Sequence, residues 1–248
     1  MVAALDAVRF ALLCGVVGLL ACGTHRAAER PPVAAPSEEC AFTPAAVAPG
    51  ASDVEQVAVA YADVKKAIES RAYCALPALV DAETLRVYEV LRQQALHAPR
   101  EQVEQQPVLE RTLILEMRTR LAGRLDRITG ADVLAAGIDP PPRLFDVLVA
   151  NVELGDVRVT GSVATAATSL KGVESPRRYR FVKEDGRWQL DLLSMARDAA
   201  PMLARHISKT GQTEDEFIED YVADRSGSPF DPAAWDPVVP EETPVPSR

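Results

Sequence analysis

The spacing of the apolar residues changes near residue 145, and this change limits the fold more than any other feature of the sequence. Before it, apolar side chains recur at three- and four-residue steps, which is the period of amphipathic helices. From Phe145 to Leu170 they alternate with polar side chains, as in half-buried β-strands. Helices followed by a run of antiparallel strands predict an α+β fold.

Four helices are predicted in the first half of the chain. The first is capped by Ser52 or Asp53, and its apolar side comprises Val54, Val57, Tyr61, Val64 and Ile68. The second follows Asp81. The third spans about 107–122, with Pro107 in the first turn and a Glu116–Arg120 pair. The fourth follows Thr129, with Asp132 at the third position, and is ended by Gly137 and Pro140.

Two β-hairpins are predicted after these helices. Gly155-Asp156 is expected to form a two-residue turn that places Leu154 against Val157, Val152 against Val159 and Glu153 against Arg158. A second turn is expected at Asp185-Gly186. It places Tyr179 opposite Leu192, Phe181 opposite Leu190, Lys183 alongside Trp188 and, on the other face, Arg180 opposite Asp191.

Two further helices and a proline-rich segment complete the chain. One helix is predicted from about Ala196 to Ser208, and the last is capped by Thr213 with Glu216 completing a capping box. Residues 225–248 are predicted to be a disordered tail. The tail repeats an aromatic-Asp-Pro triplet at Phe230 and Trp235, which would dock on a partner, fold back onto the domain or do nothing.

The N-terminus combines a short apolar run with a cysteine. The run from Phe10 to Cys22 is too short to span a membrane but fits the core of a signal peptide. Leu19-Leu20-Ala21-Cys22-Gly23 resembles the lipobox of bacterial lipoproteins. This resemblance implies cleavage before Cys22, a diacylglyceryl group on its thiol and acylation of its new amino terminus, and several acyl chains anchor stably. Gly23, rather than Asp, implies sorting to the outer membrane.

The segment after Cys22 is predicted to be an extended tether, because residues 24–52 are rich in Ala, Pro, Ser and Glu without periodicity. Cys14 leaves with the signal peptide, so Cys40 and Cys74 remain. In an oxidising compartment these two cysteines are expected to form a disulfide, although two unpaired thiols are the alternative. No CxxC or nearby histidine makes them metal ligands.

The second hairpin also supports a family resemblance. Helices followed by a strand meander that ends in Phe181-Val182-Lys183-Glu184-Asp185-Gly186-Arg187-Trp188-Gln189-Leu190-Asp191 resemble the nuclear-transport-factor-2-like (NTF2-like, including SnoaL-like) superfamily. The resemblance covers about residues 53–200. It implies a curved sheet that wraps a helix to form a cone, and it leaves function open because this fold hosts enzymes, binders and dimerising scaffolds.

Candidate catalytic residues are few. His25 lies in the tether, His97 ends a helix, and His206 lies in a helix; for all three a structural or inert role is favoured. Tyr61 or Tyr88 is a candidate hydrogen-bond donor inside a cone, with core packing as the favoured alternative. Asp146 is a candidate general base, with a solvated edge residue as the favoured alternative. The acidic residues Glu214, Asp215, Glu216, Glu219 and Asp220 are explained by helix capping and the helix dipole rather than by a cation.

Charge and motif content narrow the function classes. The net charge of −9 argues against a general nucleic-acid binder and against electrostatic adhesion to anionic lipid. No cofactor or metal motif is present. The expected organisation is a signal peptide (1–21), a lipidated cysteine and tether (22–52), an α+β domain (53–224) and a tail (225–248).

Three functions fit this organisation. The absence of catalytic motifs favours a non-enzymatic envelope lipoprotein facing the periplasm, whose domain binds a partner or an apolar ligand. An isomerase, dehydratase or cyclase would instead need a deep apolar pocket with a buried Asp–Tyr or Asp–His pair. An accessory domain that forms homodimers would show an exposed apolar patch on Tyr179, Phe181 or Leu190.

Overall fold

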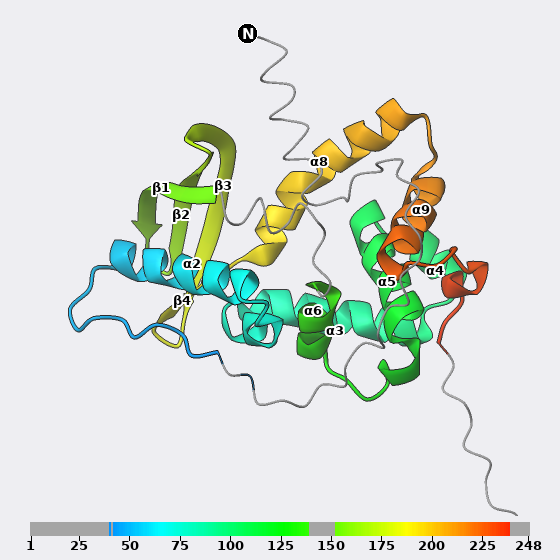
Figure 1. Ribbon diagram of the computed structural model, residues 1–248, viewed down its shortest axis with the longest axis horizontal. Helices are drawn as coiled ribbons and strands as arrows, with labels where there is room; N and C mark the ends of the chain where they lie inside the picture. The colour runs from blue at the N-terminus through cyan, green and yellow to red at the C-terminus, as the bar shows by residue number, and fades with distance from the viewer. Residues whose placement is uncertain (1–39, 41, 139–151, 239–248) are drawn as a thin grey trace, which may run out of the picture.

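A computed structural model describes residues 40, 42–138 and 152–238 (Figure 1). A sheet crossed by α2 (Asp53–Glu69) lies on one side of the molecule, and a group of helices lies on the other (Figure 1). The long helix α8 (Leu192–Thr210) connects the sheet to this helical group. The fold is therefore α+β, with helices before an open antiparallel sheet and further helices after it.

The sheet has four antiparallel strands in the order β1-β2-β3-β4, which are β1 (Val152–Thr160), β2 (Val163–Leu170), β3 (Val173–Glu184) and β4 (Arg187–Leu190). One face packs on α2 and on the 3-10 helix η1 (Tyr73–Ala78). The chain after η1 runs along β4, where Leu190 N donates to Leu79 O at 3.0 Å and Asp81 N to Leu190 O at 3.1 Å. This pairing covers the β4 edge.

The hairpin predicted at Asp185-Gly186 is confirmed. Phe181 pairs with Leu190 and Lys183 with Trp188. Both turn residues have positive φ, 47° and 78°, which matches the right-handed twist of the strands. Arg180 forms the expected ion pair with Asp191. The predicted Tyr179–Leu192 pair is wrong, because Leu192 already begins α8.

The hairpin predicted at Gly155-Asp156 is wrong. These two residues lie inside β1, opposite the single residue Ala167, and form a β-bulge between the pairs Leu154–Thr168 and Val157–Ala166. The turn comes six residues later, at Gly161-Ser162, where Thr160 pairs with Val163. Consequently the predicted Leu154–Val157, Val152–Val159 and Glu153–Arg158 pairs do not form.

The helical group contains α3 (Ala82–His97), α4 (Arg100–Glu104), α5 (Val108–Leu121), η2 (Ala122–Arg124), α6 (Gly130–Ile138) and α9 (Glu214–Ser226). The predicted helices are confirmed here, with caps at Asp81 and Thr213, and α2 beside the sheet is capped by Ser52. Three details differ. Pro107 is the residue before α5 rather than in its first turn, Val54 is 46% exposed instead of buried, and Gly137 lies inside α6 instead of ending it.

Helix α8 is longer than predicted and begins four residues earlier than Ala196. Asp191, 5% exposed, caps it by accepting from Ser194 N at 2.8 Å. Gly211 ends it with φ 75°. Residues 187–192 alternate between apolar and polar side chains as a strand does, and this pattern conceals the start of the helix. Asp191, the first residue after β4, is already the helix cap.

Both segments flanking the domain are attached to it where the structure describes them. Cys40 is bonded to Cys74, and Ala45 N donates to both carboxylate oxygens of Asp63, at 3.0 and 3.1 Å. At the other end, the predicted disordered tail is wrong up to Val238. A 3-10 helix, η3 (Pro232–Trp235), buries Trp235 to 1% exposure.

Candidate functional site

The cysteine pair at the start of the described chain is the first predicted feature that the structure brings together. Cys40 and Cys74 form a disulfide with a Cα–Cα distance of 5.8 Å. Phe42, two residues after Cys40, packs against the core beneath α2, with Lys66 Nζ 5.4 Å from its ring centroid. Cys22 and His25 lie outside the described residues.

The inner face of the sheet is the place where a cone would hold a ligand. Large side chains occupy it: Phe181 is fully buried, Trp188 is 5% exposed, and both pack against α2. The Trp188 indole donates to Asp53 Oδ1 at 3.1 Å. The space between α2 and the sheet is thus packed with side chains rather than open.

Tyr61 is the one candidate that does point toward the sheet. Its hydroxyl donates to Val152 O at 3.2 Å, and its ring is tilted against Tyr179 at 5.8 Å. Burial raises the pKa of both phenols. With its proton committed to a backbone carbonyl, Tyr61 joins α2 to β1 rather than presenting a donor to a substrate.

The apolar patch that would favour dimerisation is not present on these described residues. Phe181 and Leu190 are 0% and 4% exposed, and Tyr179 is half-buried toward Tyr61. All three face α2 and the core, so they offer no outer contact surface to a second copy of the chain.

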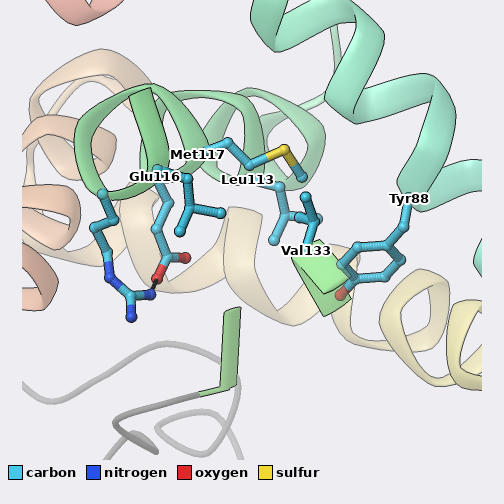
Figure 2. Close-up of a pocket in the computed structure, with 7 residues that line it drawn as sticks. Tyr88, Leu113, Glu116, Met117 and Val133 are labelled. Atoms are coloured by element: carbon cyan, nitrogen blue, oxygen red, sulfur yellow. Dashed lines mark hydrogen bonds and ion pairs between the residues drawn. The ribbon is translucent and has the colours of Figure 1, made fainter. Parts of the chain in front are cut away.

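A small cavity lies in the helical group instead (Figure 2). It measures about 20 Å³, which is room for little more than one water molecule. Its walls come from α3, α5 and α6 and are formed by Tyr88, Leu113, Glu116, Met117, Arg120, Leu121 and Val133. Leu113 and Val133 lie between the Glu116 carboxylate and the Tyr88 phenol, which sit at opposite ends (Figure 2).

The two polar groups at the cavity have separate surroundings. Glu116 Oε1 accepts from Arg120 and from Arg225, whose Nε lies at 3.1 Å and Nη2 at 3.0 Å, and all three side chains are under 9% exposed. Burial raises the pKa of Tyr88 to about 12. Glu116 therefore ties α5 to α9, and its ion pairs oppose a role as a general base.

The remaining candidates do not converge on one site. His97 is exposed at the end of α3, and His206 stacks edge-to-face with Phe217 at 6.1 Å. The acidic residues of α9 have separate partners: Glu214 and Asp215 bind Arg111, Glu216 closes the capping box, Glu219 accepts from Trp235 and Asp220 from Gln212. Asp146 lies outside the described residues. The described residues contain no group of His, Cys, Asp or Glu side chains that could hold a metal ion.

Sequence reasoning missed one buried charge. Arg118 of α5 is 3% exposed and donates to the carbonyl oxygens of Gln94, Ala95 and Ala98 at the end of α3. Its Nη1 also donates to Trp235 O at 2.5 Å. No sequence signal predicts this, because an arginine among leucines on a helix is ordinarily a solvated residue. The repeated triplet at Trp235 did mark the other partner.

Comparisons with known proteins add no identification. The chain matches none of the protein families, curated proteins or solved structures with which it was compared. Within the part of the chain that the structure describes, no helix is long and apolar enough to cross a membrane.

Proposed function

We propose that this chain is a lipid-anchored protein of the bacterial cell envelope, and that its α+β domain binds a protein partner without catalysing a reaction. Cys22 would carry the lipid, and the domain would face the periplasm from the outer membrane. The observation that carries the proposal is the Cys40–Cys74 disulfide. Cys40 lies 18 residues after Cys22, and disulfides form and persist in oxidising compartments.

The packing of the sheet supports a protein partner over a small apolar ligand. A drug-sized ligand needs a pocket of roughly 300–1,000 Å³. The inner face of the sheet is filled by side chains such as Phe181 and Trp188, and the cavity between α3, α5 and α6 holds only about 20 Å³. A larger hollow of about 410 Å³ at the turn between α8 and α9 is lined by polar and acidic residues such as Glu216 and Asp220, which do not suit an apolar ligand. A partner would therefore bind an outer surface of the domain.

We further propose that α2 and the four strands are a short NTF2-like cone. Support comes from the order of helices before strands, from α2 packed on the inner sheet face, and from the hairpin at Asp185-Gly186. In this arrangement the cone holds its own side chains, so the superfamily's enzymatic uses would be lost and its outer surfaces would remain for binding.

Replacement of Cys22 tests the anchor. We expect Cys22→Ser to move most of the protein from the membrane fraction to the soluble periplasmic fraction, because the thiol that carries the diacylglyceryl group is gone. Cys14→Ser is the matched control, since Cys14 would leave with the signal peptide. Membrane fractionation with immunoblotting measures both. A Cys22→Ser protein that still sediments with membranes would contradict the proposal.

A further inference from the structure

The C-terminal segment Ser228–Val238, which we name the C-terminal strap, packs against the helical group, and we call the place that it occupies the groove. It lies beside α4, α5 and α9, at the side of the molecule away from the sheet (Figure 1). Trp235 is its anchor at 1% exposure, and Phe230, Ala234 and Val238 pack around the same core. The groove therefore takes one large aromatic side chain flanked by small apolar contacts.

Polar groups around Trp235 fix the orientation of the strap. The indole Nε1 donates to Glu219 Oε1 at 2.9 Å, and the Arg100 guanidinium lies 5.3 Å from the ring centroid, within cation–π distance. Arg118 donates to the Trp235 carbonyl from beneath. These contacts are made to the indole and to the backbone carbonyl of the tryptophan. They therefore specify a tryptophan and not just any apolar side chain.

The strap is attached in the manner of a bound peptide. It follows Gly227, which ends α9 with φ 71°, and it contributes one four-residue 3-10 turn and no strand pairing. Without it, Arg118 keeps its bonds to Gln94, Ala95 and Ala98, and only its Nη1 loses its acceptors in the strap. The Arg118 guanidinium would therefore stay anchored to the end of α3 if the strap left.

We propose that this groove is a recognition site for a linear protein segment that carries a tryptophan, and that the C-terminal strap is a displaceable internal occupant of it. The partner is a protein that presents such a segment in the conformation of the strap, with the tryptophan at the end of a 3-10 turn. The inference rests on the protein-binding part of the proposed function and is independent of the lipid on Cys22.

Displacement can be observed in the full chain without any substitution of its residues. The protein contains two tryptophans, Trp188 in the sheet and Trp235 in the strap, so 5-fluorotryptophan labelling gives one fluorine resonance for each. We expect an unlabelled peptide of residues 228–238 to move the Trp235 resonance toward its solvent-exposed position and to leave Trp188 unchanged. Because a short tether gives the strap a local concentration of about millimolar, half-displacement is expected at about millimolar peptide.

Variants of the full chain separate recognition from folding. Trp235→Ala removes the internal anchor, and the peptide should bind this variant at least about tenfold more tightly than the wild-type chain. Adding Arg100→Ala should weaken that binding about two- to fivefold. Arg86→Ala is the matched control, because Arg86 is also an exposed helical arginine paired with a nearby glutamate, and it should change nothing.

The outcomes decide the inference. It is overturned if the Trp235 resonance stays in place at several millimolar peptide, and this result counts even if Trp235→Ala fails to fold. It is also overturned if a peptide with Trp replaced by Ala displaces the strap equally well. Concentration-dependent dimerisation without peptide would assign the groove to a second copy and overturn the external partner. None of these results bears on membrane release by Cys22→Ser.

Discussion

Glu89 is the residue whose charge contributes most visibly to the packing of α3 on its neighbours. Its carboxylate accepts from Arg92 at 2.6 and 3.0 Å, from Gln93 at 3.0 Å and from the backbone N of Gly130 at 2.7 Å. Hydrogen bonding from Arg92 is the main cause that lowers the pKa of Glu89 to about 2. This one side chain thereby joins α3 to the start of α6.

The lowered pKa gives a pH-dependent prediction. In the unfolded chain Glu89 titrates near 4.5, so its contribution to stability is complete above that pH and is lost as the pH falls toward 2. We expect Glu89→Gln to be less stable than wild type at neutral pH and to lose less stability between pH 4.5 and 2. Urea unfolding at a series of pH values measures this.

Glu101→Gln provides the comparison for that experiment, because Glu101 is an exposed residue of α4. It should follow the wild-type curve. If Glu89→Gln also follows the wild-type curve, the carboxylate does not stabilise the contact between α3 and α6.

At the scale of elements, α6 packs unusually close to α3 through Gly130. A Cβ atom placed on Gly130 would lie 2.6 Å from Glu89 Cα and closer still to its backbone N, so no side-chain rotation could make room. Gly130 also donates to the Glu89 carboxylate. The glycine is required here by close approach of two backbones rather than by its φ angle.

Two glycine substitutions test this contact. We expect Gly130→Ala to lower the free energy of unfolding by about 1–3 kcal/mol or more, because α6 must move away from α3. Gly123→Ala in η2 meets nothing within 4 Å and should be neutral or stabilise by up to about 1 kcal/mol. Thermal and urea unfolding compare them, and equal stabilities would show that α6 shifts without cost.

The elements also show which sequence signals were sufficient. Helix caps such as Ser52, Asp81 and Thr213 act locally, and each began a helix where predicted. Gly155-Asp156 misled because a Gly-Asp pair suits a bulge as well as a turn, and only pairing with β2 selects between them. At the candidate site, the sequence marked Trp235 by the repeated aromatic-Asp-Pro triplet. The burial of Arg118 could not be predicted in the same way, because it depends on α3 and η3 meeting over α5.

At the scale of the whole molecule, the Cys40–Cys74 bridge should contribute much of the stability. It closes a loop with a sequence separation of 34 residues, which corresponds to about 3–4 kcal/mol in the chain-entropy view. We expect the Cys40→Ser/Cys74→Ser variant to unfold at correspondingly lower urea concentration. Wild-type protein in excess dithiothreitol should match it, while dithiothreitol should not affect the variant. Identical urea midpoints for oxidised and reduced wild type would contradict the prediction.

The same bridge determines where the domain would bear mechanical tension. A pull on the chain before Cys40 passes through the two sulfur atoms into η1 and bypasses residues 42–73. Helix α2 and the segment before it therefore lie outside the force path, and tension cannot peel them from the sheet. The load enters beside β4, where Leu79 and Leu190 are hydrogen-bonded. If the domain is held by its N-terminal end, the force would therefore act at the β4 edge of the sheet. The segment between Cys40 and α2 would carry no tension.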